Sequence, residues 1–320
     1  MCPSSAQRNR KKALGAGSGQ HDRTSGISGI LLLDKPTGMS SHDALLRAQN
    51  LLHAKKIGHA GTLDPLATGV LPLALGEATK ACNYLLESDK GYVATATLGI
   101  RTNTGDSTGE IVEVSPVPAL HAELIESVLQ KFRGTSEQIP PMHSALKQGG
   151  EKLYLLARAG VEVVRAARPI TIHRLVLQAY AERTLELEID CRKGTYIRTL
   201  IEAIGGALGC GAHVSALRRT WVAPFQSLAM VTLDELAQLE PRARWAKLAP
   251  TEAALAHFTA TQLDADQEAY FLCGVLLNIK QAPGLCCVSG PSGLLGVGEV
   301  DGCGALRVVR GIRVAKVAPT

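Results

Sequence analysis

The sequence contains few aromatic residues and no long apolar run. Phenylalanine, tryptophan and tyrosine together make up 4% of the 320 residues. No stretch of about 18 consecutive apolar residues occurs, so we expect no membrane-spanning helix. The first residues also lack the apolar segment of a secretory signal peptide, which favours a cytoplasmic protein.

Cysteine is present, but not in a pattern that indicates disulfides or a metal. None of the eight cysteines forms a Cys-x-x-Cys pair with another. We therefore expect free thiols in a reducing compartment. Histidines and acids do not cluster with metal-ligand spacing either, and no glycine loop has phosphate-binding spacing. The sequence thus predicts neither a metal nor a cofactor.

The net charge of +5 is unevenly distributed. Residues 1–26 carry five basic side chains and one acid, so the remaining chain is close to neutral. This tail has little apolar content, and we expect residues 1–27 to be disordered. It either adds non-specific contact with a polyanion or has no role. Residues 131–174 hold eight Lys or Arg and three Glu. Such a local excess is either a solvated face or a surface for a polyanion, and the interspersed Tyr154, Met142 and prolines favour the second.

The length of the chain and the change in its residue pattern after residue 248 indicate two folded parts. Apolar residues make up 46% of the chain, enough for a sizeable core. The pattern predicts strands over 29–34, 70–75 and 91–100, a strand pair over 175–191, and helices over 41–53, 77–86, 118–131 and 196–208. Residues 133–151 show no clear periodicity, which is typical of a functional loop. After residue 248 short apolar runs alternate with Gly and Pro, as expected for a small β-rich module. Globally this predicts an α+β fold with a mixed, mostly antiparallel sheet and a small C-terminal β-barrel.

One carboxylate stands alone in a glycine-rich loop. In "KIGHAGTLDPLATGV" (56–70) Asp64 lies between Leu63 and Pro65, and the next acid along the chain is Glu77. An Asp-Pro pair in a turn is common, so this stretch alone does not indicate catalysis. A single carboxylate among apolar side chains nevertheless suits a reaction that needs one base or nucleophile away from water.

Four stretches together resemble the TruB family of pseudouridine synthases, the bacterial-type tRNA pseudouridine-55 synthases. They are "LLLDKPTGMSS" (31–41), "GHAGTLDPLATGVL" (58–71), "DKGYVATATLG" (89–99) and "CRKGTYIRTL" (191–200) followed by "GCGAHVSALRRT" (209–220). The resemblance spans about residues 28–220. It implies a synthase domain over 28–248 with a mobile thumb over about 131–165, and a PUA-like RNA-binding module over 249–320.

The resemblance also implies the activity and its partner. The expected reaction isomerises uridine 55 in the T-loop of tRNA to pseudouridine, by a monomeric enzyme that binds the T-arm without cofactor or metal. Two alternatives are a guide-RNA-dependent synthase and a non-catalytic RNA-binding protein or tRNA-folding chaperone. The length of the thumb favours the guide-free enzyme, and the intact motif residues argue against the chaperone.

The resemblance further implies roles for individual side chains. Asp64 would be the catalytic carboxylate, by attack on C6 of uracil, by attack on C1′ or by proton removal from C2′. An arginine beside it would keep it ionised despite burial. The implied substrate-binding residues are His59, Tyr92, Tyr196, Arg198 and Leu217, where Tyr92 stacks on the flipped base, Arg198 pairs with Asp64 and His59 fills the place of the flipped base.

Each of these residues also has an ordinary structural interpretation. Tyr92, Tyr196 and Leu217 could be ordinary packing residues, and Arg198 an exposed helix arginine. Lys35 and Pro36 would support the catalytic loop rather than react. Arg218 and Arg219 would contact phosphate or be solvated. Residues 251–320 carry five basic and six acidic side chains, so the module either binds the acceptor stem through one edge or serves as a structural cap.

Overall fold

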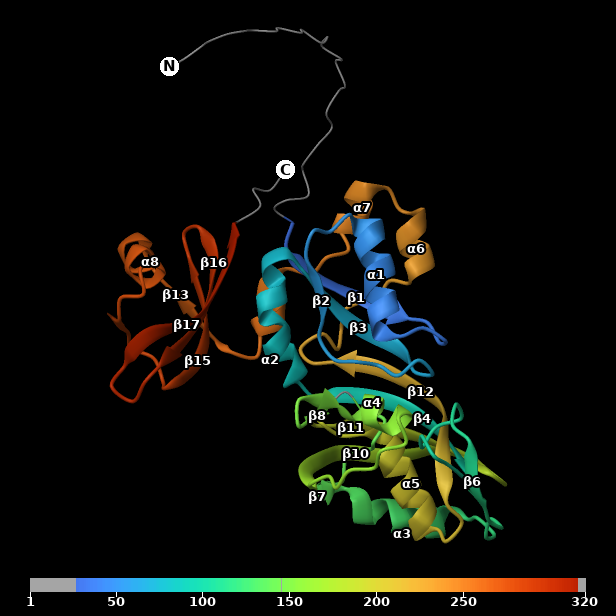
Figure 1. Cartoon of the computed structure of the whole chain (residues 1–320). Coiled ribbons are helices and arrows are strands. Elements are labelled where there is room, and N and C mark those ends of the chain that lie inside the picture. Colours follow the sequence, from blue (N-terminus) through green and yellow to red (C-terminus); the bar gives the residue numbers. More distant parts are fainter. Residues whose placement is uncertain (1–26, 145, 316–320) are drawn as a thin grey trace, which may run out of the picture.

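The computed structural model describes residues 27–144 and 146–315. The tail over residues 1–26, for which the sequence predicts disorder, lies outside the described residues. The described chain forms a large sheet with helices and a smaller C-terminal sheet, which lies to one side of the large sheet in Figure 1. None of the described helices is long and apolar enough to cross a membrane.

The large sheet has eight strands in the order β1-β3-β12-β4-β11-β10-β7, with β2 paired to β3. Neighbouring strands are antiparallel except β3 and β12, which run parallel. The predicted mixed, mostly antiparallel sheet is therefore confirmed. Its strands are β1 (Gly29–Lys35), β2 (Ile57–His59), β3 (Thr68–Leu75), β4 (Lys90–Leu98), β7 (Gly134–Gln138), β10 (Arg168–Ala181), β11 (Thr184–Cys191) and β12 (Ala212–Val222).

Strand β1 is buried on both faces, which explains its unbroken apolar sequence. Leu31 and Leu33 belong to the main core, where one face of the sheet packs against α1 (Ser41–Leu52), α3 (Ala122–Leu129) and α5 (Ile197–Ala207). Ile30 and Leu32 point to the other face and join a second core. Two short helices, α6 (Leu233–Gln238) and α7 (Pro241–Trp245), lie beside α1 (Figure 1).

Local signals account for the start of α1. The Ser40 hydroxyl accepts a hydrogen bond from the Asp43 amide, which satisfies one of the free N–H groups of the first turn. The helix ends at His53, whose φ of 49° is left-handed. The helix predicted over residues 41–53 is therefore confirmed within one residue.

Shorter elements connect these layers. Two hairpins stand outside the large sheet and pair only with themselves. The hairpins are β5 (Ile100–Thr102) with β6 (Ile111–Val114), and β8 (Lys147–Gln148) with β9 (Glu151–Lys152). The short helical elements are α2 (Cys82–Leu86), α4 (Leu153–Arg158), and 3-10 turns over Gly76–Ala81, Gln130–Phe132 and Thr251–Leu255. Helix α4 and the β8–β9 hairpin lie within the predicted thumb.

Three expected elements differ from the structure. The helix predicted over 118–131 begins only at Ala122, after an extended segment with Pro116 and Pro118. The helix predicted over 77–86 is a 3-10 turn followed by α2. The irregular segment 133–151 contains β7, whose sequence GTSEQ lacks apolar alternation because it is the exposed edge strand.

The C-terminal module is a curled five-stranded sheet in the order β13-β15-β16-β17-β14. Its pairing does not close into a full barrel among the described residues, so the predicted small barrel is a half-barrel. Its elements are β13 (Thr259–Gln262), α8 (Ala265–Leu272), β14 (Leu277–Asn278), β15 (Gly284–Gly290), β16 (Gly293–Val300) and β17 (Ala305–Ala315). The boundary near residue 248 stays a prediction.

Candidate active site

Asp64 lies on the loop between β2 and β3, and side chains from β1 and α1 hold this loop. The Ser41 hydroxyl accepts from the Leu63 amide at 2.8 Å and donates to the Leu63 carbonyl at 2.9 Å. The Gly38 amide donates to the Pro65 carbonyl at 2.8 Å. Both backbone groups next to Asp64 are thus tied to other segments, which limits the movement of the carboxylate.

Lys35 lies at the end of β1 and is fully buried. Its ammonium donates to the carbonyls of Pro36 and Met39 at 2.8 and 2.7 Å and lies 3.5 Å from the Pro65 carbonyl. Burial lowers the pKa of Lys35 to about 8, although nearby Asp64 acts in the opposite direction. These contacts join the turn after β1 to the Asp64 loop, which is the arrangement that a loop-supporting role for Lys35 and Pro36 requires.

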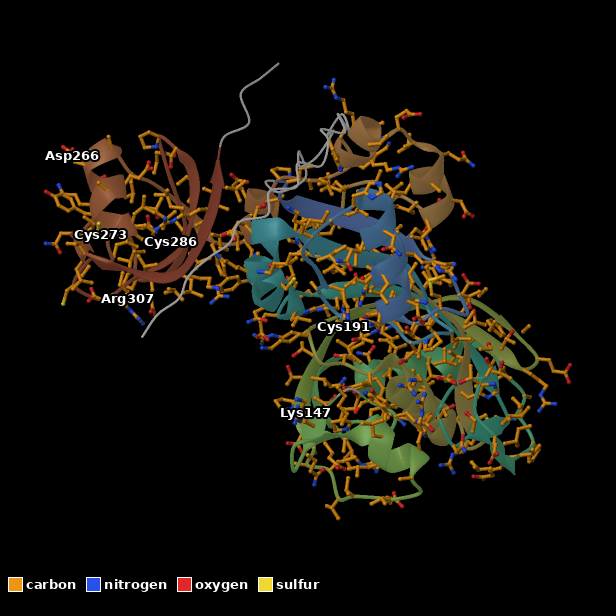
Figure 2. The ribbon with its side chains drawn as sticks, turned by 45° about the horizontal axis from the view of Figure 1, so that its top comes forward. Lys147, Cys191, Asp266, Cys273, Cys286 and Arg307 are labelled. Atoms are coloured by element: carbon orange, nitrogen blue, oxygen red, sulfur yellow. The ribbon has the colours of Figure 1, made fainter. Side chains whose placement is uncertain are left out.

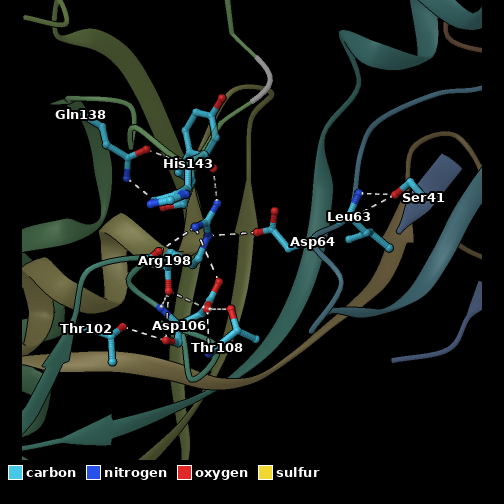
Figure 3. Close-up of polar contacts among 11 residues, drawn as sticks. Ser41, Leu63, Asp64, Thr102, Asp106, Thr108, Gln138, His143 and Arg198 are labelled. Carbon is cyan, nitrogen blue, oxygen red and sulfur yellow. Dashed lines mark hydrogen bonds and ion pairs between the residues drawn. The ribbon is translucent and has the colours of Figure 1, made fainter. Parts of the chain in front are cut away.

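Arg198, in the first turn of α5, lies between two carboxylates (Figure 3). Its Nε is 3.0 Å from Asp64 Oδ2, and its Nη1 is 3.6 Å from Asp106 Oδ2. The same guanidinium donates to the carbonyls of Thr104 and His143 at 2.6 and 2.7 Å. The expected Arg198–Asp64 ion pair is therefore present, and the backbone carbonyls fix its orientation.

Asp106 is the more enclosed of the two carboxylates. Its side chain is 6% exposed, whereas that of Asp64 is 37% exposed. Asp106 Oδ1 accepts from the hydroxyls of Thr104 and Thr108 at 2.8 and 2.6 Å and from the Thr108 amide at 3.0 Å (Figure 3). With its oxygens held in this way, Asp106 can position Arg198, while Asp64 remains open to a substrate.

Burial raises the pKa of Asp64, and the charge of Arg198 opposes that rise. A carboxylate with a raised pKa and one strong cationic partner is a typical reactive group.

Tyr196 precedes α5 and keeps this helix start in place, because its amide donates to Gln138 Oε1 at 2.8 Å and its carbonyl accepts from Gln138 Nε2 at 3.1 Å.

A cavity of about 640 Å³ opens at Asp64. Residues from the Asp64 loop, β4, β12, α4 and the start of α5 line it. Of the residues predicted from the sequence, it brings together Asp64, Tyr92, Tyr196, Arg198 and Leu217. Tyr92 and Leu217 are 8% and 7% exposed, so each presents only a small surface to the cavity.

His59, Lys35 and Pro36 do not line this cavity. His59 is the last residue of β2 and pairs with Leu73 of β3. Burial lowers the pKa of its imidazole, with Arg219 adding to the effect. The buried Nδ1 of His59 has no hydrogen-bond partner among the described residues, and its substrate-binding role stays a prediction.

The interpretation of Arg219 as solvated or phosphate-binding is wrong, whereas Arg218 is partly exposed and that interpretation stays a prediction for it. Arg219 is 1% exposed and donates to the carbonyls of Val70 and Gly61 at 2.7 and 3.2 Å. Arg218 forms two hydrogen bonds with Asp34, at 3.0 and 2.7 Å. Both arginines therefore hold the sheet around the Asp64 loop. A run of two arginines resembles a surface patch, and only strand pairing shows that Arg219 is interior.

Several site residues were not found from the sequence, above all Asp106, Lys90 and Gln138. Asp106 stands alone in "NTGDSTG" (103–109), a polar turn with two glycines, which is the same signal that singled out Asp64. Gln138 gives no local signal, because its role depends on a segment 58 residues away.

The arrangement suits covalent or proton-transfer chemistry on a flat ring. It combines an open carboxylate, an arginine that stabilises its charge, and three tyrosines (Tyr92, Tyr154 and Tyr196) in one cavity. Among the described residues there is no group of three or more His, Cys, Asp or Glu that could hold a metal ion.

Comparison with known proteins gives a consistent match. A family model described as "TruB family pseudouridylate synthase (N terminal domain)" matches residues 49–197. A second, "tRNA pseudouridylate synthase B C-terminal domain", matches residues 198–256. Among solved structures, the fold is similar to that in "Crystal Structure of a Cbf5-Nop10-Gar1 Complex", with a TM-score of 0.71 and 25% identity over 92% of this chain and 88% of that one.

Curated relatives match over nearly the whole chain. The protein named tRNA pseudouridine synthase B of Aromatoleum aromaticum is 48% identical over 281 residues, which are 88% of this chain and 91% of the relative. That of Pseudomonas aeruginosa is 47% identical over 294 residues, 90% of this chain and 96% of the relative. Because two adjoining family models and full-length relatives agree, the chain belongs to the TruB family of pseudouridine synthases, and it is an isomerase.

Proposed function

We propose that the protein converts the uridine at position 55 in the T-loop of tRNA to pseudouridine, with Asp64 as the catalytic carboxylate. The observation that carries the proposal is the Asp64–Arg198 ion pair on the wall of a cavity of about 640 Å³. Cavities of this size accept a group as large as a flipped nucleotide. The name shared by the full-length relatives supports tRNA as the substrate.

The reaction breaks the N1–C1′ bond of uridine and joins C5 of the ring to C1′. Asp64 would act by adding to C6, by adding to C1′ or by removing the C2′ proton. Each route needs the carboxylate in its charged form. Arg198 favours that form.

Three side chains would hold the flipped base. Tyr92 would stack on the ring, Leu217 would contact its other side, and Tyr196 would contact the nucleotide. Their presence in the lining of the same cavity as Asp64 supports these roles. Basic residues of the thumb would bind phosphates of the T-arm and so position the RNA, whose shape gives the specificity.

The alternatives are less well supported. The solved "Structure of H/ACA RNP bound to a substrate RNA containing 2'-deoxyuridine" is similar to this chain, with a TM-score of 0.67 and 25% identity. The relatives at 47–48% identity are instead named tRNA pseudouridine synthase B, which favours direct recognition of tRNA without a guide RNA. A silent RNA chaperone would not need the Asp64–Arg198–Asp106 arrangement. We also propose that the enzyme acts as a monomer in the cytoplasm.

The substitution Asp64→Asn tests the catalytic assignment, because it removes the charge and keeps the shape. We expect single-turnover formation of pseudouridine to fall by about 10³-fold or more, with unchanged affinity for tRNA. The matched control is Asp266→Asn, at an exposed carboxylate of the C-terminal module (Figure 2), which should convert tRNA at the wild-type rate. Conversion by Asp64→Asn at a rate near that of the control would refute the assignment.

A further inference from the structure

The charges that line the cavity are unbalanced. Five basic side chains line it against two acids, Asp64 and Asp106. Both acids pair with Arg198. Two of the remaining cations, Lys90 and Arg219, are buried, with 8% and 1% exposure. Neither forms an ion pair within the described ranges 27–144 and 146–315.

Lys90 begins β4, two residues before Tyr92. Its ammonium donates to the carbonyls of Leu86, at 3.3 Å, and Ser88. An ammonium carries three donors, so these two bonds leave one. The neighbouring Asp89 lies 3.2 Å from His173 and does not form an ion pair with Lys90. The charge of Lys90 is therefore held by carbonyl dipoles and not by a carboxylate.

Arg219 approaches Lys90 from β12, where it is the register partner of Tyr92. The two side chains meet at Gly61, three residues before Asp64. A Cβ atom added to Gly61 would lie 3.4 Å from Arg219 Nη1 and 3.8 Å from Lys90 Cε. Burial raises the pKa of Tyr92, and the charge of nearby Arg219 opposes that rise. Two buried cations thus lie together beneath the tyrosine and next to the catalytic loop.

A buried cation without a partner anion is unfavourable, and one that lines a reaction site can stabilise negative charge that develops there. When the N1–C1′ bond of uridine breaks, both bonding electrons stay on the ring. We propose that Lys90, supported by Arg219, stabilises the uracil ring while it carries this electron pair. This inference rests on the proposed function and adds a group that acts on the leaving base and not on the ribose.

The step balances without any further reactant. On the ribose side, Asp64 either bonds to C1′ or takes the C2′ proton; on the third route it bonds to C6 first. The anionic ring then turns and C5 bonds to C1′, while the bond or proton on Asp64 is returned. The C5 proton is lost and N1 gains one, which gives an isomer of the substrate. Lys90 keeps its proton throughout and contributes only its charge, and Arg219 is a positioning residue.

The charge of Lys90 is sensitive to pH in the working range. Burial lowers its pKa to about 8, with Arg219 acting in the same direction and Cys191 and Asp89 against it. Burial raises the pKa of Cys191 to about 12, so this thiol stays neutral near pH 8. The cavity should therefore lose a positive charge as the pH rises through about 8. Lys35, which also lies near Asp64, has a similar pKa of about 8. The effect of Lys90 on the pH profile must therefore be distinguished from that of Lys35 by substituting Lys90.

The test compares Lys90→Arg and Lys90→Met with the wild-type enzyme, in single turnovers with saturating unmodified tRNA between pH 6.5 and 9.5. Lys90→Met should be slower by about 100-fold at pH 7. Lys90→Arg should retain most of the rate and lose the fall near pH 8, because arginine stays charged. Lys247→Met, at an exposed lysine, is the control and should keep the wild-type profile.

A second substrate separates electrostatics from a structural role. Fluorine stabilises a ring anion by itself, but 5-fluorouridine has no C5 proton to lose, so the rate measured here is consumption of the target nucleoside in a single turnover and not formation of pseudouridine. This rate should show a smaller loss for Lys90→Met on tRNA with 5-fluorouridine at the target position than on uridine tRNA. An equal loss on both substrates, or a fall near pH 8 that is as steep in Lys90→Arg as in the wild type, would overturn the proposal. If Lys90→Met does not fold, the profile of Lys90→Arg still decides. Wild-type protein that forms no pseudouridine would instead refute the proposed function.

Discussion

Burial raises the pKa of Asp64, and Arg198 works against that rise. An acid with a raised pKa loses its charge as the pH falls through that pKa, so the charged, active form is present only above it. Without Arg198 the pKa of Asp64 should rise further. We predict that Arg198→Met shifts the acid limb of the single-turnover rate to higher pH and slows conversion at neutral pH.

The measurement is the pH profile of pseudouridine formation on saturating tRNA. Because Arg198 pairs with Asp64 and Asp106 in this account and not with phosphates, the affinity for tRNA should change much less than the rate. Asp106→Asn should shift the limb in the opposite direction, to lower pH, because the negative charge of Asp106 raises the pKa of Asp64. Loss of tRNA affinity with an unshifted acid limb would show that Arg198 is a phosphate contact.

At the scale of single residues, the resemblance predicts the members of the site that belong to sequence motifs. Asp64 and Arg198 stand in such motifs, and their ion pair is present. Arg219 could not be placed, because its burial arises only when β12 pairs with β3 and β4. Lys90 stands in the motif with Tyr92, but its hydrogen bonds to carbonyls of the preceding turn could not be predicted from the sequence.

At the scale of elements, the basic charge of the thumb divides into two kinds. Arg133 pairs with Glu126 and donates twice to the Leu175 carbonyl, at 3.0 and 2.7 Å. It therefore joins the region to β10 and is not available to RNA. Lys147 and Lys152, on the β8–β9 hairpin, are exposed, and Lys147 projects at the outer edge in Figure 2.

We predict that Lys147→Ala with Lys152→Ala weakens binding of folded tRNA and reduces the slope of log K against log salt by up to about two, since each phosphate contact contributes about one. Turnover of bound tRNA should remain. The measurement is a titration of tRNA at several salt concentrations, with Lys247→Ala as the control. An unchanged slope would mean that the thumb hairpin does not bind phosphate.

Elements with strong local patterns were predictable, whereas others depended on their neighbours. Strand β1 and helix α1 were predicted within one residue, because an apolar run and a serine cap are local signals. The edge strand β7 was not, because an exposed edge needs no apolar side chains. Its place is determined by pairing with β10, which begins 30 residues after the end of β7.

At the scale of the whole molecule, the C-terminal module shares a core with the rest of the chain. Leu294, Val297 and Ile312 of the module pack in one cluster with Ile30 and Leu32 of β1. The rings of Tyr84 and Phe258 meet edge to face, with centroids 5.2 Å apart. These contacts favour the structural-cap interpretation of a module with little net positive charge, and they could not be predicted from the sequence because they join segments more than 170 residues apart.

The central claim is that this chain modifies one uridine in the T-loop of tRNA through Asp64. The most direct measurement incubates the purified protein with an unmodified tRNA transcript and maps pseudouridine at every uridine by chemical probing. The wild-type protein should give a single new pseudouridine at position 55, and Asp64→Asn should give none. Pseudouridine at other positions only, or the same modification by Asp64→Asn, would contradict the account.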